Sequence, residues 1–156
     1  MQNNNVTTEE FHKEIDLIQA CIVRMDQNSF MIKGWAFMLV TALITLASEN
    51  LELYVLCAIG NFIFLVFWFL DAFFLKMEKL YRFKYEWIIA ERPKGNREYL
   101  YDLNPYQSRT WTAGKKEPLV ISVMLSKPHT LLMFYGIPIF IGIVVIILRA
   151  TNLLGY

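Results

Sequence analysis

Asp71 is the residue in this chain whose position most invites a chemical interpretation. It interrupts the apolar run LYVLCAIGNFIFLVFWFLDAFFL (53–75), and a carboxylate in such a run is costly unless it is paired or hydrated. Lys33 falls at a similar depth when each predicted span is counted from its inner end at about 1.5 Å per residue. We expect an ion-paired polar cluster that fixes the first span against the second; the alternative is a proton or ion pathway. The expected members are Arg24, Asn28, Lys33, Asp71, Glu78 and Arg82.

A second polar set lies deeper in the apolar segments. Asn61 stands about a third of the way into the second apolar run, and Thr41 and Thr45 fall at a roughly matching depth in the first. Hydrogen bonds between helices explain such residues in most membrane proteins. The functional alternative is the lining of a pore in an oligomer, although no span offers a ring of charge.

The sequence lacks the patterns that enzymes and metalloproteins use. His12 and His129 stand alone, and there is neither a Cys/His metal-binding spacing nor a glycine-rich phosphate loop. Cys21 and Cys57 are interpreted as small apolar residues rather than as a disulfide. We therefore predict that the protein is not an enzyme and uses neither a metal nor a cofactor.

The elements that must position these residues are long helices. An uncharged stretch of about 20 residues is long enough to cross the hydrocarbon core of a bilayer. The chain, with 56% hydrophobic residues, divides on this basis into six predicted segments. They are an amphipathic cytoplasmic helix (1–29), a first span (30–47), a second span with a cytoplasmic extension (51–91), a basic and aromatic cytoplasmic loop (92–129), a third span (130–149) and an external tail (150–156).

The N-terminal segment has the pattern of an amphipathic helix. Thr7 and Glu10 have the spacing of a capping box, which satisfies free backbone N–H groups at a helix start. Apolar residues then recur at spacings of three and four, which is typical of one helix face. These residues are Phe11, Ile15, Ile18, Ile22 and Met25. We expect this face to pack on the extension of the second span, which should end near Pro93 and Gly95.

Basic residues predict the orientation of the chain. Segment 76–128 carries eleven Lys or Arg against six acids, whereas the turn after the first span has no basic residue. The positive-inside rule then places the N-terminus and segment 76–128 in the cytoplasm, with Tyr156 outside. The excess positive charge could bind anionic lipid, a protein partner or nucleic acid. Anionic lipid is the favoured target, because this segment must lie beside the membrane. The expected contact residues are Arg92, Lys94, Arg97, Arg109, Lys115 and Lys116.

Four pieces of the chain carry a resemblance to a known family. They are RMDQNSFMIKGW (24–35), FWFLDAFFLKMEKLYR (67–82), DLNPY (102–106) and VMLSKPHTLLMFYG (123–136). Together they resemble a widespread family of small bacterial inner-membrane proteins. That family is similar to the membrane accessory proteins of type VI-B CRISPR loci and of an adenosine-deaminase-based phage-defence system. The resemblance implies a role in defence and gives the motif positions listed next. They are Arg24, Asn28, Ser29, Phe30, Lys33, Gly34, Trp35, Trp68, Asp71, Glu78 and Arg82.

The expected protein is thus an all-α, three-span protein of the bacterial inner membrane that assembles into a homo-oligomer. One functional hypothesis is a defence accessory or effector that perturbs the membrane once a cytoplasmic partner is activated. The alternative is a non-conducting anchor that recruits a cytoplasmic protein or nucleoprotein complex.

Overall fold

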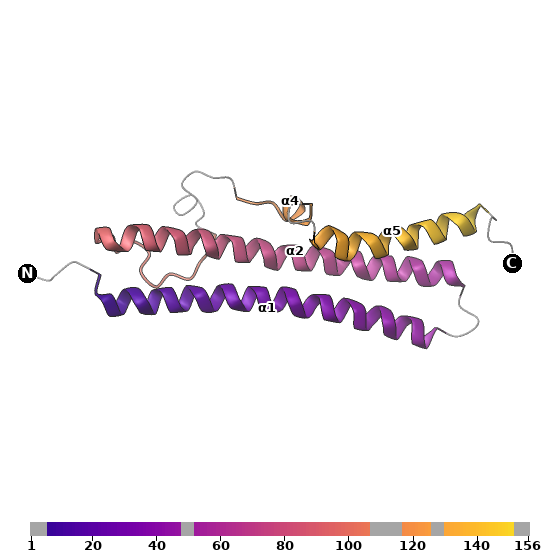
Figure 1. Cartoon of the computed structure of the whole chain (residues 1–156), viewed down its shortest axis with the longest axis horizontal. Coiled ribbons are helices and arrows are strands. Elements are labelled where there is room, and N and C mark those ends of the chain that lie inside the picture. The colour runs from indigo at the N-terminus through magenta and orange to yellow at the C-terminus, as the bar shows by residue number, and fades with distance from the viewer. Residues whose placement is uncertain (1–5, 48–51, 107–116, 126–129, 152–156) are drawn as a thin grey trace, which may run out of the picture. The chain divides into compact units, whose positions relative to one another are not determined.

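The computed structural model describes residues 6–47, 52–106, 117–125 and 130–151, and within these ranges it contains helices but no strand. The elements follow one another along the chain (Figure 1). They are α1 (Thr8–Leu46), α2 (Leu53–Glu91), the 3-10 turn η1 (Arg92–Lys94), α4 (Val120–Met124) and α5 (Thr130–Ala150). The all-α prediction is confirmed for the described residues.

The chain forms two compact units. The hairpin unit comprises residues 1–27 and 74–119, and the span unit comprises residues 28–73 and 120–156. Each of α1 and α2 is 39 residues long and contributes to both units. The predicted amphipathic segment and first span, which the sequence analysis divided between residues 29 and 30, are therefore parts of one continuous helix.

The core of the hairpin unit lies between the N-terminal part of α1 and the C-terminal half of α2. Ile18 and Cys21 of α1 pack with the α2 residues Leu80 and Ile88, among others. The five-residue apolar stripe of α1 belongs to this cluster, as its spacing predicts. Apolar burial of this kind stabilises a helix pair far more than intrinsic helix propensity does.

The ends of the helices follow local rules. Thr7 Oγ1 accepts a hydrogen bond from the Glu10 backbone N–H at 3.2 Å, and the Glu10 carboxylate accepts one from the Thr7 N–H at 2.9 Å. The predicted capping box is therefore confirmed. At the same end of the unit, where α2 ends beside the start of α1, Pro93 stands in η1 and Gly95 adopts a left-handed conformation with φ 80°. This conformation is unstrained for glycine and ends the helix.

The span unit is built from three helices. Among the described residues, α1, α2 with η1, and α5 are the helices long and apolar enough to cross a membrane. Phe37, Phe64 and Phe134 connect them through edge-to-face ring contacts. Pro138 lies inside α5, where neighbouring helices make it tolerable. The short helix α4 precedes α5 as a separate element.

Candidate functional site

Asp71 lies at the centre of a polar triad in the span unit. Its side chain is fully buried, and Lys33 Nζ lies 2.6 Å from Asp71 Oδ2. Ser29 donates a hydrogen bond to Asp71 Oδ1, and Lys33 donates one to Ser29 Oγ at 2.8 Å. Both carboxylate oxygens are thus engaged by α1. Since a buried ion pair needs such additional hydrogen bonds to offset desolvation, the triad fixes the register of α1 against α2.

The other predicted members of the cluster lie elsewhere. Glu78 and Arg82 pair within α2 at 2.6 Å, and the Arg82 side chain remains largely exposed. The Arg24 guanidinium contacts Cys21 Sγ at 3.9 Å. Asn28 is partly buried on α1 next to Ser29. The hydroxyl of Ser29 was not predicted as a member; its position four residues before Lys33, on the same helix face, is the signal for it.

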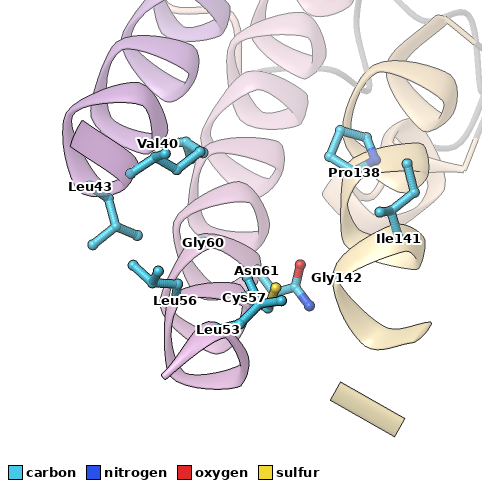
Figure 2. A pocket seen from close by; sticks show the side chains of 11 residues that line it. Val40, Leu43, Leu53, Leu56, Cys57, Gly60, Asn61, Pro138, Ile141 and Gly142 are labelled. Atoms are coloured by element: carbon cyan, nitrogen blue, oxygen red, sulfur yellow. The ribbon is translucent and has the colours of Figure 1, made fainter. Parts of the chain in front are cut away.

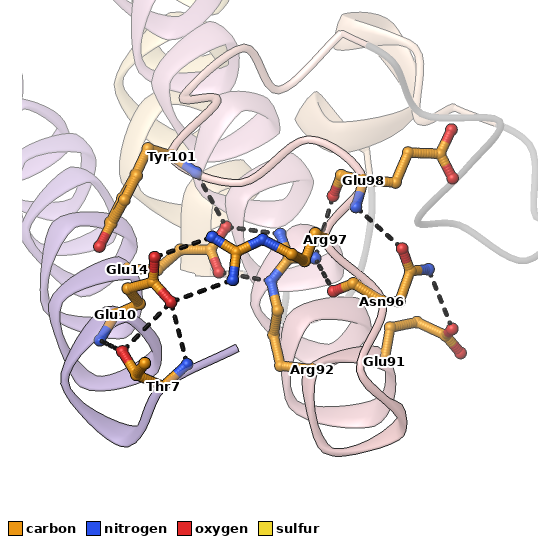
Figure 3. Close-up of polar contacts among 9 residues, drawn as sticks. All are labelled: Thr7, Glu10, Glu14, Glu91, Arg92, Asn96, Arg97, Glu98 and Tyr101. Carbon is orange, nitrogen blue, oxygen red and sulfur yellow. Dashed lines mark hydrogen bonds and ion pairs between the residues drawn. The ribbon is translucent and has the colours of Figure 1, made fainter. Parts of the chain in front are cut away.

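A second polar centre holds the hairpin unit together (Figure 3). Glu14 and Arg92 are both almost fully buried, and Arg92 donates two hydrogen bonds to the Glu14 carboxylate at 2.6 and 2.7 Å. Arg92 Nη1 also donates to the carbonyls of Asn96 and Glu98 at 2.7 and 2.9 Å. Glu14 Oε1 accepts the Tyr101 N–H at 3.2 Å. This bidentate pair therefore joins α1, the end of α2 and the segment that follows.

That segment, residues 95–106, is called the strap. Besides its bonds to Arg92, it is held by the fully buried Lys84, whose Nζ donates to the Asn104 carbonyl at 3.1 Å and lies 3.8 Å from Asp102 Oδ2. Burial lowers the pKa of Lys84, and the nearby Asp102 carboxylate opposes that shift. Tyr99 and Tyr101 have left-handed φ values of 56° and 60°. Such backbone is strained for tyrosine and persists because its surroundings hold it.

Two further ion pairs lie at the surface of the hairpin unit. Arg97 forms a bidentate pair with Glu10 at 2.8 and 3.2 Å. The Arg97 hydrogen bond, assisted by the Thr7 backbone, lowers the pKa of Glu10 to about 2. Lys94 lies 2.6 Å from Glu91, and this contact lowers the pKa of Glu91. These pairs connect the strap and η1 to the helices.

The predicted set of partner-binding cations needs a correction. Arg92 is 3% exposed and belongs to the interior, so it is a structural residue rather than a surface contact. Arg97 is engaged with Glu10, while the Lys94 side chain stays 66% exposed. Arg109, Lys115 and Lys116 lie outside the described residues. Burial therefore removes Arg92 from the predicted cationic surface.

Glu14 was not predicted as a site residue, although the sequence contains a signal for it. It lies three residues after Phe11 and four before Ile18, which places it on the apolar stripe. A charge on an apolar stripe points to a buried partner. The partner itself is 78 positions away, so no local pattern identifies it.

The deeper polar set has different surroundings. Thr45 Oγ1 donates to the Thr41 carbonyl at 2.7 Å, so its hydroxyl is satisfied within α1. Asn61 lines an apolar pocket of about 440 Å³ formed by residues of α1, α2 and α5 (Figure 2). A β-carbon on Gly142 would collide with the Asn61 amide, so α2 and α5 approach closely here. Asn61 thus stands at the contact of two helices and at the wall of a cavity.

The described residues contain no group of three or more His, Cys, Asp or Glu side chains that could hold a metal ion. In both polar centres the charged side chains bind one another, and these contacts hold helices together. Comparison of the chain with protein-family models, with curated proteins and with solved structures gives no match.

Proposed function

We propose that this protein is a multi-pass membrane anchor that presents its hairpin unit to a cytoplasmic partner, as an accessory protein of anti-phage defence in the bacterial inner membrane. The observation that carries the proposal is the construction of the hairpin unit. It has its own apolar core and its own buried ion pair, Glu14 with Arg92. A unit of this kind keeps a defined surface of its own.

The strap supplies the surface that best suits a protein partner. Its apolar side chains Tyr101, Leu103 and Tyr106 are 38%, 38% and 53% exposed. Tyrosine is among the residue types enriched at protein interfaces and at their binding hot spots. The buried Glu14–Arg92 pair holds the backbone that carries them. Because the strap is already ordered, a partner would lose little entropy in binding it.

An anchor without conduction is favoured over a pore within one chain. Asp71 is enclosed by Ser29 and Lys33, Thr45 bonds its own helix, and the described cavity among the three helices is apolar. Homo-oligomer formation and membrane perturbation on activation remain predictions from the sequence. Membrane perturbation is separable from anchoring because only perturbation requires ions to cross the bilayer.

The test combines partner capture with a measurement of membrane integrity. Full-length tagged protein is crosslinked in membranes of phage-challenged cells and purified. We expect a co-purifying protein with the wild type and with Ile89→Asp, an exposed apolar residue of α2, but at least tenfold less with Leu103→Asp. A membrane-impermeant dye should stay outside during the protective response. Equal capture by both variants would refute the strap as the surface, and dye entry would favour the effector hypothesis.

A further inference from the structure

The pocket of the span unit lies between the C-terminal part of α1, the N-terminal part of α2 and the middle of α5 (Figure 2). Its wall consists of residues from the 40–44 segment of α1, the 53–61 segment of α2 and the 138–142 segment of α5. Its volume of about 440 Å³ lies within the range of about 300–1,000 Å³ that is usual for small-molecule sites. Gly60, which has no side chain, leaves part of this space open, because a β-carbon built there meets no atom within 4 Å.

The lining determines what can enter. Apart from the Asn61 amide, the side chains around the pocket are hydrocarbon, proline or thiol. Apolar cavities stay dry and accept apolar molecules instead. All three wall segments belong to helices that suit a bilayer, where hydrocarbon is the surrounding solvent. The occupant that fits is therefore largely hydrocarbon.

Asn61 adds one specific requirement. Its amide stands about 12 Å along α2 from Leu53, and in Figure 2 it points from α2 toward α5 and Gly142. Among the described residues it has no hydrogen-bonding partner, although it is partly buried. An unsatisfied amide in hydrocarbon is costly. A molecule that lay in the pocket and carried a hydrogen-bonding oxygen would remove that cost.

We propose that this pocket binds a bilayer-soluble molecule with a hydrocarbon body and a carbonyl oxygen. The Asn61 amide donates a hydrogen bond to that oxygen, and the hydrocarbon body fills the space beside Gly60, between Val40 and Ile141. Two constituents of bacterial membranes have this chemistry, namely the acyl ester of a phospholipid and an isoprenoid quinone. The proposal does not depend on the partner-binding role of the hairpin unit.

The glycines provide matched variants. A β-carbon built on Gly60 meets no atom within 4 Å, so the side chain of Gly60→Leu starts in open space and takes up volume of the pocket. A β-carbon on Gly34 of α1 also meets nothing within 4 Å, and Gly34 is outside the pocket wall. Gly34→Leu therefore controls for the effect of a larger residue in a helix. Asn61→Leu removes the amide at similar volume.

The experiment uses the full-length protein in detergent with two photoactivatable probes, a diazirine-labelled phosphatidylethanolamine and an azidoquinone. At least one probe should label peptides of the pocket wall in the wild type and in Gly34→Leu. Labelling should fall at least tenfold in Gly60→Leu and about three- to tenfold in Asn61→Leu, since one neutral hydrogen bond is lost. An excess of the unlabelled lipid or quinone should abolish labelling by the corresponding probe. The probe that passes this competition test shows whether the bound carbonyl belongs to a phospholipid or to a quinone.

Each other outcome overturns the proposal. Absence of labelling at the pocket wall by both probes, or labelling that Gly60→Leu does not reduce, shows that the pocket is not the site. A disulfide between Cys57 residues of two copies under mild oxidation would place a protein helix at the pocket instead. If Gly60→Leu does not elute as a folded species, competition by the unlabelled probe and the Asn61→Leu variant decide the result.

Discussion

At the scale of single residues, the triad around Asp71 contains a buried charge whose stability depends on its partner. The carboxylate is fully buried, and its partner Lys33 keeps a quarter of its side chain exposed. Removing one member of a buried pair costs about 3–5 kcal/mol because the other charge is left uncompensated. Partial exposure of Lys33 lets its ammonium reach water, so we expect a cost near the lower end of that range.

The first prediction is therefore that Asp71→Ala lowers the free energy of unfolding in detergent by about 3 kcal/mol. Asp26→Ala, which alters an exposed carboxylate of α1, should have no measurable effect. The measurement is thermal unfolding of the purified protein, together with the yield of monodisperse material. Equal stability of the two variants would show that the triad contributes little.

The second prediction concerns Glu10, whose carboxylate Arg97 holds at a pKa of about 2 against an ordinary value of 4.5. A depressed folded-state pKa means that the stabilisation is complete above about pH 4.5 and is lost as the pH falls toward 2. The Glu91 carboxylate, also lowered, acts with the same sign. A carbon-detected NMR titration of Glu10 should give a midpoint near 2 in the wild type and a higher midpoint in Arg97→Gln, where the hydrogen bonds from Thr7 still hold the pKa below its ordinary value. A wild-type midpoint near 4.5 would contradict the pairing.

At the scale of elements, the strap depends on the side chain of Arg92. Arg92→Met should leave the Glu14 carboxylate and the carbonyls of Asn96 and Glu98 without their donor. The third prediction is a loss of about 3–5 kcal/mol and faster amide hydrogen exchange across residues 96–104. Lys94→Met, which alters an exposed cation two residues away, should leave both quantities unchanged. Exchange that stays slow in Arg92→Met would show that the strap is held mainly by Lys84.

The packing of α5 on α2 gives the fourth prediction. Gly142→Ala should cost about 1–3 kcal/mol, because the new methyl group collides with the Asn61 amide. Gly136→Ala on the same helix meets only Leu132 at 3.5 Å, an ordinary contact, so it should be neutral or slightly stabilising. Thermal unfolding of both variants checks this. The double variant Gly142→Ala/Asn61→Ala should recover the stability that Gly142→Ala loses. If it does not, the Asn61 amide is not the group with which the new methyl group collides.

At the scale of the whole molecule, three spans would put the two termini on opposite sides of the membrane. The fifth prediction is that alkaline phosphatase fused after Tyr156 is active, and that green fluorescent protein fused before Met1 is fluorescent. The reason is the eleven basic residues between 76 and 128, which resist translocation. Fluorescence of the green protein at the C-terminus would reverse the proposed orientation.

Local patterns predicted much of this architecture. Three of these features depend on neighbours within a few residues: the apolar stripe of α1, the capping box at Thr7, and the end of α2 at Glu91, two residues before Pro93. The parts that escaped prediction depend on distant partners. Ser29 meets a carboxylate 42 positions away, and Arg92 is buried by a glutamate 78 positions away. The pocket likewise exists only because residues of three helices come together around Gly60.

The buried pair of Glu14 and Arg92 also constrains how this chain can diverge. A substitution at either position alone leaves an isolated buried charge, whereas a joint replacement by apolar residues removes both charges at once. Descendants of this sequence should therefore change the two positions together or in quick succession. Correlated substitution at positions 14 and 92 in related sequences would then indicate that those proteins also have the strap.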